Sequence, residues 1–576
     1  MPPVRIKGEE LRWKIEDRMR EHKIPAVSIA VFENYELSWA KAYGMAEVGA
    51  GTRATEQTLF LAGSISKSVN ALGVMLAVSD GTLGLDTPVN ELLDSWKLPE
   101  NELTLAKPVT IRMLLSHTAG TTVHGFPGYA AGAAIPTVQQ ILDGEPPANT
   151  AAVRVDLAPG SQFRYSGGGT TITQLALAER SKLPYQDVLA TRVLGPLGMT
   201  HSTFEQVLTP ERLRHAAAGY APAGNVIEGQ RHSYPEMAAA GLWTTPSDLA
   251  RFFAELARAR AGKSSKIATA VATEMTKRVQ GGEVSGAESV GLGVFLSERN
   301  GAPLFGHGGA DEGFQANAVA SLDGGYGVIV MANSDNGSRI FAEIERAVFA
   351  EYGWPGAEPE HVRVALDPAK REQVLGHYVF GRMENAIAEK DGKLVAWTPF
   401  QLPFELVPIG PDRLIRRDSG AVLGIVGAGT VQVQRPPELA RTITRVPAAE
   451  HHPLFALESG DFDGAVAAWR ERVKARPGSA EGEERDANEL GYRLMVRDPA
   501  QAVEVLRLVA TVFPQSSNAH DSLGEVYALV GDKAHAITAY EQSLKLLDSD
   551  LKVPEGEKST RRSLAEKQLA RLRAAN

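Results

Sequence analysis

One serine and one lysine near the start of the chain have the spacing that nucleophilic catalysis requires. They lie in residues 62–68, AGSISKS, which open a stretch over 64–80 with apolar side chains at helical intervals and Gly81 after its end. Three residues is just under one helical turn, so Ser64 and Lys67 are expected on one face, within contact reach. Free N–H groups at a helix start favour negative charge near Ser64. A partly desolvated Lys67 would have a lowered pKa and could accept the hydroxyl proton.

The same residues also have a purely structural interpretation, in which Ser64 caps the helix and Lys67 is solvated. Other common catalytic patterns are missing: the sequence has no complete G-x-S-x-G, no H-E-x-x-H, no phosphate loop and no full G-x-G-x-x-G. The chain contains no cysteine, which excludes disulfides, thiolate zinc sites and a cysteine nucleophile. We therefore expect no cofactor and no metal.

Two further segments accompany the serine and the lysine. Residues 163–169 read FRYSGGG and contain Tyr165, and residues 305–310 read FGHGGA and stand directly before a predicted strand. In order and separation the three segments resemble the motifs S-x-x-K, Y-x-N and [KH]-[TSG]-G of the serine beta-lactamase and penicillin-binding superfamily. The likeness is greatest to class C beta-lactamases, family VIII esterases and D-aminopeptidases. It covers about residues 10–355, with agreement in the connecting segments 109–120, 196–199 and 241–249.

This resemblance implies roles for the first two motifs. Ser64 would be the nucleophile that forms an acyl-enzyme, and Lys67 and Tyr165 would share the proton transfers. Which of the two is the general base stays open at this point. The oxyanion hole would consist of the backbone N–H groups of Ser64 and Ala310, the latter on the strand after the third motif.

The resemblance also implies substrate-binding positions. Gly308 and Gly309 would let a substrate approach the strand edge closely, and Trp243 would line the cleft. His307 stands where relatives often have lysine, so its charge would vary near neutral pH. Gly167 replaces the asparagine that usually ends the second motif and contacts the amide side chain of lactam substrates. That replacement puts efficient beta-lactam turnover in doubt and leaves acyl transfer intact.

The predicted function is therefore a serine hydrolase that cleaves small esters or amides, or peptides, through an acyl-enzyme on Ser64. One alternative is a D,D-peptidase or beta-lactamase, which shares the mechanism and differs in substrate. Another is a binding protein in which the C-terminal repeats matter and the hydrolase core is a passive scaffold.

The pattern of elements predicts an α+β fold for residues 1–355, with an antiparallel sheet drawn from both ends of the region and a helical subdomain between them. Strands are expected at 26–32, 36–43, 290–296, 315–321 and 326–332, and a helix at 337–352. This is the layout that the resemblance implies for a beta-lactamase-like domain.

Two smaller domains are predicted to follow. Residues 360–447 contain five short strand-like runs, which indicate a small barrel or sandwich. Relatives of this layout carry a lipocalin-like barrel there that could cover the cleft.

In residues 450–576, Leu490-Gly491 and Leu523-Gly524 lie 33 residues apart, and this region resembles helical tetratricopeptide repeats. Such repeats would provide a protein-binding surface. An ordinary helical bundle is the alternative.

Composition narrows the classes of partner. The chain has 576 residues, of which 43% are hydrophobic and 22% charged, and this length and composition indicate several globular domains. Its formal net charge of −9 fits nucleic-acid binding poorly. No run approaches the roughly 18 apolar residues of a membrane span, and Met1 to Val4 lack the apolar core of a secretory signal. The family resemblance favours a periplasmic or secreted location, while a cytoplasmic one stays open.

Overall fold

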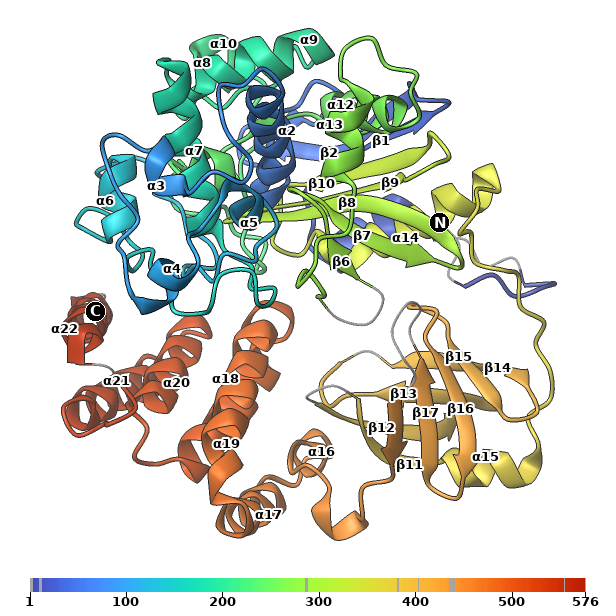
Figure 1. The fold of residues 1–576 in the computed structure, drawn as a ribbon. Coiled ribbons are helices and arrows are strands. Elements are labelled where there is room, and N and C mark those ends of the chain that lie inside the picture. The colour runs from blue at the N-terminus through green and yellow to red at the C-terminus, as the bar shows by residue number, and fades with distance from the viewer. Residues whose placement is uncertain are drawn as a thin grey trace. The chain divides into compact units, whose positions relative to one another are not determined.

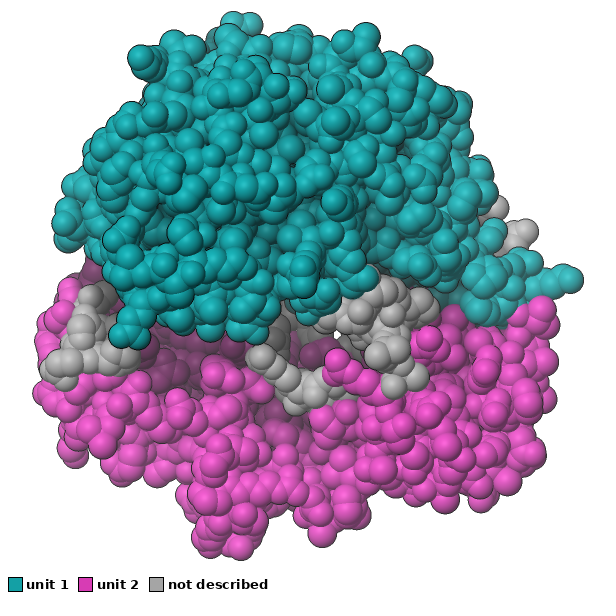
Figure 2. Space-filling view, in the orientation of Figure 1, with its two compact units in different colours: residues 1–361, 435–439 teal, residues 362–434, 440–576 magenta. Residues whose placement is uncertain are grey.

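The computed structural model describes residues 4–9, 13–284, 288–380, 383–401, 403–434, 441–553 and 555–574. These residues form two compact units that divide between His361 and Val362 (Figures 1 and 2). The first unit contains all three sequence motifs. The second contains the barrel and the C-terminal helices.

The first unit is built on an eight-stranded antiparallel sheet in the order β3-β2-β1-β10-β9-β8-β7-β6. Strands from the two ends of the unit meet at its centre, because β1 pairs with β10. This arrangement confirms the expected α+β layout. The strands are β1 (Ala26–Glu33), β2 (Glu36–Glu47), β3 (Thr52–Arg53), β6 (Ser289–Val290), β7 (Phe295–Arg299), β8 (Ala302–Asp311), β9 (Phe314–Ser321) and β10 (Gly327–Ala332).

The central strands β1 and β10 are buried along almost their whole length, because helices cover both faces of the sheet (Figure 1). Side chains alternate between the faces of a strand. In β1, Val27, Ile29 and Val31 pack with helices α1 (Ile15–Glu21) and α14 (Ser338–Tyr352). The intervening Ala26, Ala30 and Phe32 belong to the larger core on the other face, which includes α12 (Pro246–Arg260).

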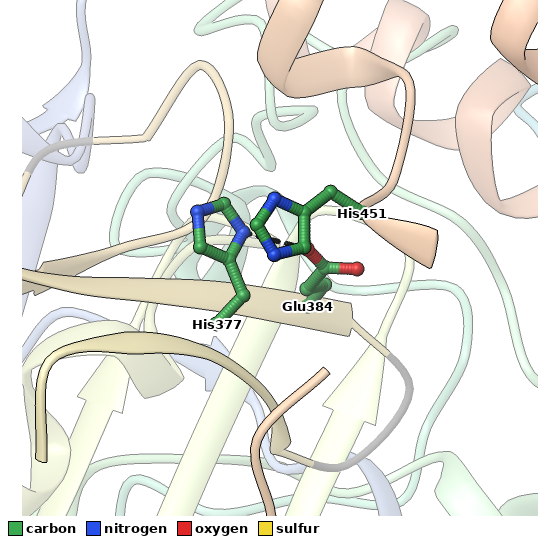
Figure 3. A group of neighbouring side chains, drawn as sticks. All are labelled: His377, Glu384 and His451. Atoms are coloured by element: carbon green, nitrogen blue, oxygen red, sulfur yellow. Dashed lines mark hydrogen bonds and ion pairs between the residues drawn. The ribbon is translucent and has the colours of Figure 1, made fainter. Parts of the chain in front are cut away.

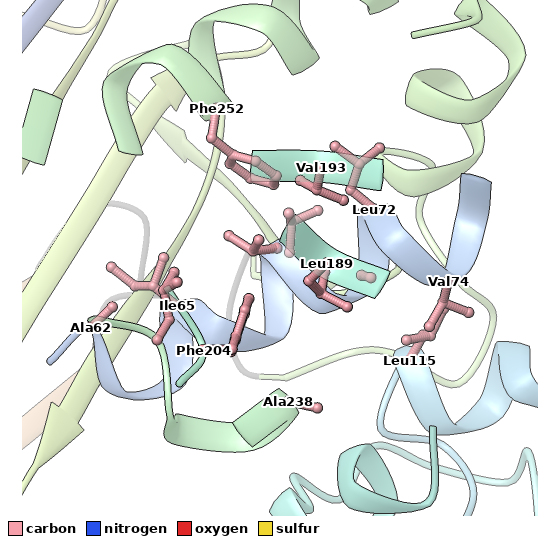
Figure 4. Close-up of a cluster of buried hydrophobic side chains, with 14 of the residues drawn as sticks. Ala62, Ile65, Leu72, Val74, Leu115, Leu189, Val193, Phe204, Ala238 and Phe252 are labelled. Carbon is pink, nitrogen blue, oxygen red and sulfur yellow. The ribbon is translucent and has the colours of Figure 1, made fainter. Parts of the chain in front are cut away.

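The larger core surrounds helix α2 (Ser66–Ser79), which is buried along most of its length. Figure 4 shows Leu72 of this helix gathered with Leu189, Val193 and Phe252. The other elements of this part are α3 (Val89–Leu92), α4 (Glu102–Ala106), α5 (Ile111–Leu115), α6 (Val138–Asp143), α7 (Gly167–Ser181), α8 (Tyr185–Leu189), η2 (Ala190–Leu194), α9 (Gly195–Leu197), α10 (Pro210–Leu213), α11 (Met237–Ala240), α13 (Thr269–Met275), and the paired strands β4 (Phe60–Leu61) and β5 (Trp243–Thr244).

Two sequence expectations about strands were wrong. The third motif lies inside strand β8, and Ala310 is on that same strand and not on a later one. Its glycines have low strand propensity and hide the strand in the sequence. The strand expected at 290–296 is divided into β6 and β7, because Gly293 adopts a φ of 72° and packs against Ala71 of α2.

The second unit contains a nearly closed antiparallel barrel of eight strands in sequence order. A bridge between Tyr378 and Arg445 joins its first and last strands. The sequence indicated only five of these strands. The bounds are β11 (Gly376–Phe380), β12 (Met383–Lys390), β13 (Lys393–Trp397), β14 (Phe404–Gly410), β15 (Arg413–Arg416), β16 (Val422–Gly427), β17 (Thr430–Gln434) and β18 (Arg441–Thr444), preceded by helix α15 (Pro368–Val374).

The rest of the second unit is helical. Its helices are α16 (Leu454–Glu458), α17 (Phe462–Ala475), α18 (Ala480–Arg497), α19 (Pro499–Val512), α20 (Ser517–Leu529), α21 (Lys533–Leu547) and α22 (Glu555–Ala574). None of the helices in the described ranges is both long enough and apolar enough to cross a bilayer.

In the first unit, the turn that precedes α2 and strand β8 approach each other closely enough to require glycine on both sides. A Cβ atom on Gly309 would lie 1.9 Å from the carbonyl oxygen of Ala62, and one on Gly63 would lie 2.5 Å from the backbone nitrogen of Ala310. Gly63 also has a φ of 51°, which favours glycine. These glycines therefore bring the backbones of Ser64 and Ala310 together.

This close approach predicts different outcomes for two neighbouring substitutions. Gly309→Ala should lower the free energy of unfolding by about 1–3 kcal/mol, because the methyl group must push two backbones apart. Gly308→Ala should change it by less than about 1 kcal/mol, because a Cβ atom there would have its nearest neighbour at 3.6 Å. Urea denaturation of both variants measures the difference, and equal stability of the two would contradict the described packing.

Candidate active site

Ser64 and Lys67 meet as their spacing predicts. Ser64 lies in a short 3-10 turn, η1 (Gly63–Ile65), and Lys67 lies in the first turn of α2, which begins two residues later than expected. The ammonium nitrogen of Lys67 donates to Ser64 Oγ at 3.0 Å and to the carbonyl oxygen of Ala239 at 2.7 Å. Lys67 is only 3% exposed. The side chain is therefore held between the serine and helix α11.

Burial changes the protonation of this lysine. Desolvation lowers the pKa of Lys67 to about 7, and the opposing attraction of Asp311 is the smaller effect. Loss of hydration destabilises the charged ammonium more than the neutral amine. At neutral pH a large fraction of Lys67 is consequently the free amine, which can accept a proton from the Ser64 hydroxyl.

Tyr165 comes from the segment before helix α7 and reaches the same place. Its ring centre lies 5.0 Å from Lys67 Nζ. Burial raises the pKa of Tyr165, and a hydrogen bond with Ser64 opposes that rise only in part. The phenol therefore keeps its proton at neutral pH.

His117 packs against Tyr165 in the same region. The two ring centres are 4.3 Å apart, and His117 Nδ1 accepts a hydrogen bond from the backbone N–H of Ser166 at 3.2 Å. Burial lowers the pKa of His117 well below its ordinary value, so the ring packs on Tyr165 as a neutral group. His117 thereby fixes the position of the phenol.

His307 lies on β8 in the same region, but its expected charge change does not occur near neutral pH. Burial and the nearby Lys67 lower the pKa of His307 to about 3. Its Nδ1 donates to the carbonyl oxygen of Gly308 at 2.5 Å, which leaves Nε2 as the acceptor. The imidazole is thus neutral and cannot supply the positive charge of the lysine that it replaces.

Most of the predicted site residues line one cavity of about 860 Å³. They are Ser64, Lys67, Tyr165, His307, Gly308, Gly309 and Ala310. Gly167 and Trp243, which were expected to bind substrate, are not among its lining residues in the described part of the chain. Gly167 begins α7 against Phe126, while Trp243 is buried and packs edge-to-face with Phe314. Both predictions of substrate contact are therefore unsupported by the geometry.

Two buried acids near this cavity escaped the sequence reasoning. Asp311, the last residue of β8, lines the cavity, and Glu236 is fully buried beside α11. Burial raises the pKa of Asp311 well above its ordinary value and that of Glu236 to about 7. Residues two apart on a strand point to the same face, so His307, Gly309 and Asp311 share one face of β8. This spacing was the available signal for Asp311. Nothing in the sequence distinguished Glu236 from a solvated acid.

A separate group of metal-binding residue types lies in the second unit. Donor atoms of His377, Glu384 and His451 lie within 4.8 Å of one another (Figure 3). The two imidazole rings are stacked, however, with centres 3.6 Å apart and planes at 7°. A metal ion lies near the plane of each ligating ring at about 2 Å, and parallel planes offer no such common point. Glu384 already accepts from His377 Nδ1 and from the backbone of His452. The arrangement does not fit a metal ion.

Comparison with known proteins places this site in a family. A model of the Beta-lactamase family matches residues 11–351, more than half of the chain. Penicillin-binding protein 4 of Amycolatopsis lactamdurans is 25% identical over 369 residues, which cover 60% of this chain and 92% of that protein. Protein flp of Staphylococcus aureus strain N315 is 26% identical over 236 residues, 40% of this chain and 44% of Flp. The match thus spans less than half of the length of Flp.

Solved structures with a similar fold include the octameric penicillin-binding protein homologue from Pyrococcus abyssi and SurE in complex with D-Leu. The TM-scores are 0.49 and 0.47, with 22% and 23% sequence identity. Each match covers 75% of this chain, and 98% and 97% of the two structures respectively. Because the family model matches residues 11–351, this chain belongs to the Beta-lactamase family.

Proposed function

We propose that the protein is a serine hydrolase that cleaves carboxylic esters or amides through an acyl-enzyme on Ser64. The observation that carries the proposal is the buried Lys67 amine, 3.0 Å from Ser64 Oγ, with a pKa lowered to about 7. Membership of the Beta-lactamase family supports serine hydrolase or acyl-transferase activity in general. The cavity around Ser64 is large enough for a small ester, an amide or the end of a peptide.

The geometry supports Lys67, and not Tyr165, as the general base. Burial moves the two pKa values in opposite directions, so at neutral pH the amine is available as an acceptor while the phenol keeps its proton. In the proposed first step Lys67 takes the Ser64 proton while Oγ forms a bond to the carbonyl carbon. Tyr165 would then serve as a hydrogen-bonded relay that returns the proton to the leaving group.

The developing negative charge on the carbonyl oxygen would be stabilised by the backbone N–H groups of Ser64 and Ala310. Their closeness follows from the glycine contacts at Gly63 and Gly309. The leaving alcohol or amine departs with the proton that Lys67 had accepted. Water, deprotonated by the same amine, then attacks the acyl carbon and the bond to Ser64 Oγ breaks. The proton on Lys67 returns to Oγ, which restores the enzyme.

Two alternatives are weaker. The named penicillin-binding relative gives some support to a D,D-peptidase or beta-lactamase. Gly167, however, begins helix α7 where the resembling motif has asparagine, which weighs against efficient turnover of lactams. The second alternative, a binding protein on a passive scaffold, is opposed by Ser64, Lys67 and Tyr165 lining one cavity.

We further propose the domain division 1–355, 360–447 and 450–576, with a lipocalin-like barrel and tetratricopeptide-like repeats. In support of repeats, equivalent helix pairs pack at a glycine. Gly491 of α18 lies against Leu506 of α19, and Gly524 of α20 lies against the ring of Tyr540 of α21. Surfaces of such repeats bind peptides in other proteins, so a protein partner is a reasonable ligand for this region.

Substitution of the two central residues tests the proposed mechanism. Ser64→Ala should abolish hydrolysis of p-nitrophenyl acetate and labelling by a fluorophosphonate probe, because the variant lacks the hydroxyl that attacks the substrate and the probe. Lys67→Ala should lower the acylation rate by at least about a thousandfold, because the serine loses its base. Stopped-flow acylation kinetics measure both. Wild-type rates in Ser64→Ala, or a loss below about tenfold in Lys67→Ala, would contradict the assignment.

The pH dependence of kcat/KM tests the choice of base. Lys67 acts only as the neutral amine, so activity should be present above its pKa and lost as the pH falls through about 7. At pH 5 the rate should be about a hundredfold below its plateau. His307, with a pKa of about 3, contributes nothing in this range. A rate that rises only above pH 9 would instead identify an ordinary lysine or a tyrosine as the base.

A further inference from the structure

The first unit contains a second cavity, which shares no lining residue with the cavity around Ser64. It has a volume of about 510 Å³ and is formed by strands β2 and β3, the segment that leads into β4, and the residues that follow α10. The proposed hydrolase does not use it. Polar side chains that line it include Lys41, Thr52, Arg53, Thr55, Arg214 and His215.

The charges that line this cavity are mostly positive. Lys41, Arg53 and Arg214 are basic, and Glu56 is the one acidic residue among the lining residues in the described part of the chain. With His215 neutral, the lining therefore carries two uncompensated positive charges, in a chain whose formal net charge is −9. A local excess of positive charge in an acidic protein attracts anions to that place.

The two arginines of the cavity differ from most arginines of the first unit. Arg112 and Arg180 show the common pattern, in which the guanidinium group forms an ion pair with an aspartate. Within the ranges that the structure describes, neither Arg53 nor Arg214 forms an ion pair or a side-chain hydrogen bond. Lys41 has no ion pair there either, and its ammonium group lies 5.1 Å from the ring centre of a neighbouring tyrosine. The charges of all three are thus available to a ligand.

Hydrogen bonds hold together the backbone segments that form the cavity. The N–H of Leu59 donates to the carbonyl oxygen of His215 at 2.8 Å, and the N–H of Ala218 donates to the carbonyl oxygen of Ala46 in β2 at 2.9 Å. Strand β3, which carries Arg53, pairs with β2. The basic side chains therefore extend from one preformed framework, which lowers the entropy lost when a ligand binds.

The polar groups of the lining are mainly hydrogen-bond donors. Guanidinium and ammonium groups only donate, and the hydroxyl groups of Thr52 and Thr55 can donate to a ligand as well. The oxygens of a dianionic phosphate group only accept, and one arginine can bind two of them at once. A phosphate group therefore matches both the charge and the donors of this cavity.

We propose that this cavity binds the phosphate group of a small organic phosphate monoester, with Arg53 and Arg214 on its oxygens and Lys41 as a third cation. The two uncompensated positive charges of the lining match the dianion that a monoester forms above its second pKa of about 6. The volume of about 510 Å³ lies in the range of small-molecule sites and leaves room for an organic group beside the phosphate. The site is separate from Ser64, so failure of either proposal leaves the other standing.

Isothermal titration calorimetry of the full chain with phenyl phosphate, at pH 8 and fixed ionic strength, tests the proposal. Phenyl phosphate should bind at one site per chain with a Kd below about 1 mM. Benzoate keeps the ring but carries a single charge, so it should bind at least about tenfold more weakly. Inorganic phosphate separates the two sources of the same chemistry. Weaker binding than that of phenyl phosphate supports an organic ester, and equal or tighter binding would overturn the ester in favour of the free ion.

Substitutions of exposed residues locate the binding. Arg53→Gln and Arg214→Gln should each raise the Kd for phenyl phosphate by at least about tenfold, because each removes a charged donor. Glu56→Gln should lower the Kd by about two- to fivefold, because it removes the repulsive charge of the lining. Arg278→Gln is the matched control: Arg278 is exposed, loses the same charge and lines neither cavity. It should leave the Kd within about twofold of the wild-type value.

These variants also define the results that contradict the proposal. A Kd above about 1 mM for phenyl phosphate would overturn it, and so would a Kd that Arg53→Gln and Arg214→Gln leave unchanged. An equal rise of the Kd in Arg278→Gln would show a general effect of charge and would overturn the site as well. All four substituted side chains are exposed, so the variants should fold as the wild-type protein does, which circular dichroism checks.

Discussion

The site depends on one constraint: the amine of Lys67 must be kept out of water and yet held against the Ser64 hydroxyl. A lysine at the surface would be fully protonated at neutral pH and useless as a base. Here helix α2 is buried along most of its length, and the carbonyl oxygen of Ala239 holds the nitrogen through a second hydrogen bond. The large apolar core around α2 therefore has a chemical consequence, because the desolvation that it imposes lowers the pKa of this amine.

The same exclusion of water sets the protonation of the other groups in the cavity. Tyr165 keeps its proton, His307 is a neutral imidazole, and Asp311 is destabilised as a carboxylate. Because burial disfavours charge on these groups, few fixed charges in the cavity interfere with the negative charge that develops on the carbonyl oxygen of the substrate. Close contact between the η1 turn and strand β8, which only glycine permits at Gly63 and Gly309, completes this arrangement.

The sequence predicted the local parts of this arrangement better than the distant ones. Ser64 and Lys67 were paired correctly because three residues of helix determine their relation. Tyr165 is about a hundred residues away, and only the family resemblance linked it to them. Strand β8 was missed because its glycines, which the close approach to the η1 turn requires, look like a turn. Asp311 was missed because a sequence gives no sign that an acid is buried. In the barrel, the charged residues of β12 concealed a strand.

The central claim, that burial makes Lys67 a neutral amine at physiological pH, can be measured directly. Protein labelled with ¹³C and ¹⁵N in its lysines would be titrated by NMR, with the Lys67 signal assigned from its absence in Lys67→Arg. The account predicts that the Cε resonance of Lys67 titrates near pH 7, while exposed lysines titrate above pH 10. A Lys67 resonance that stays in the protonated position up to pH 9 or beyond would contradict the account.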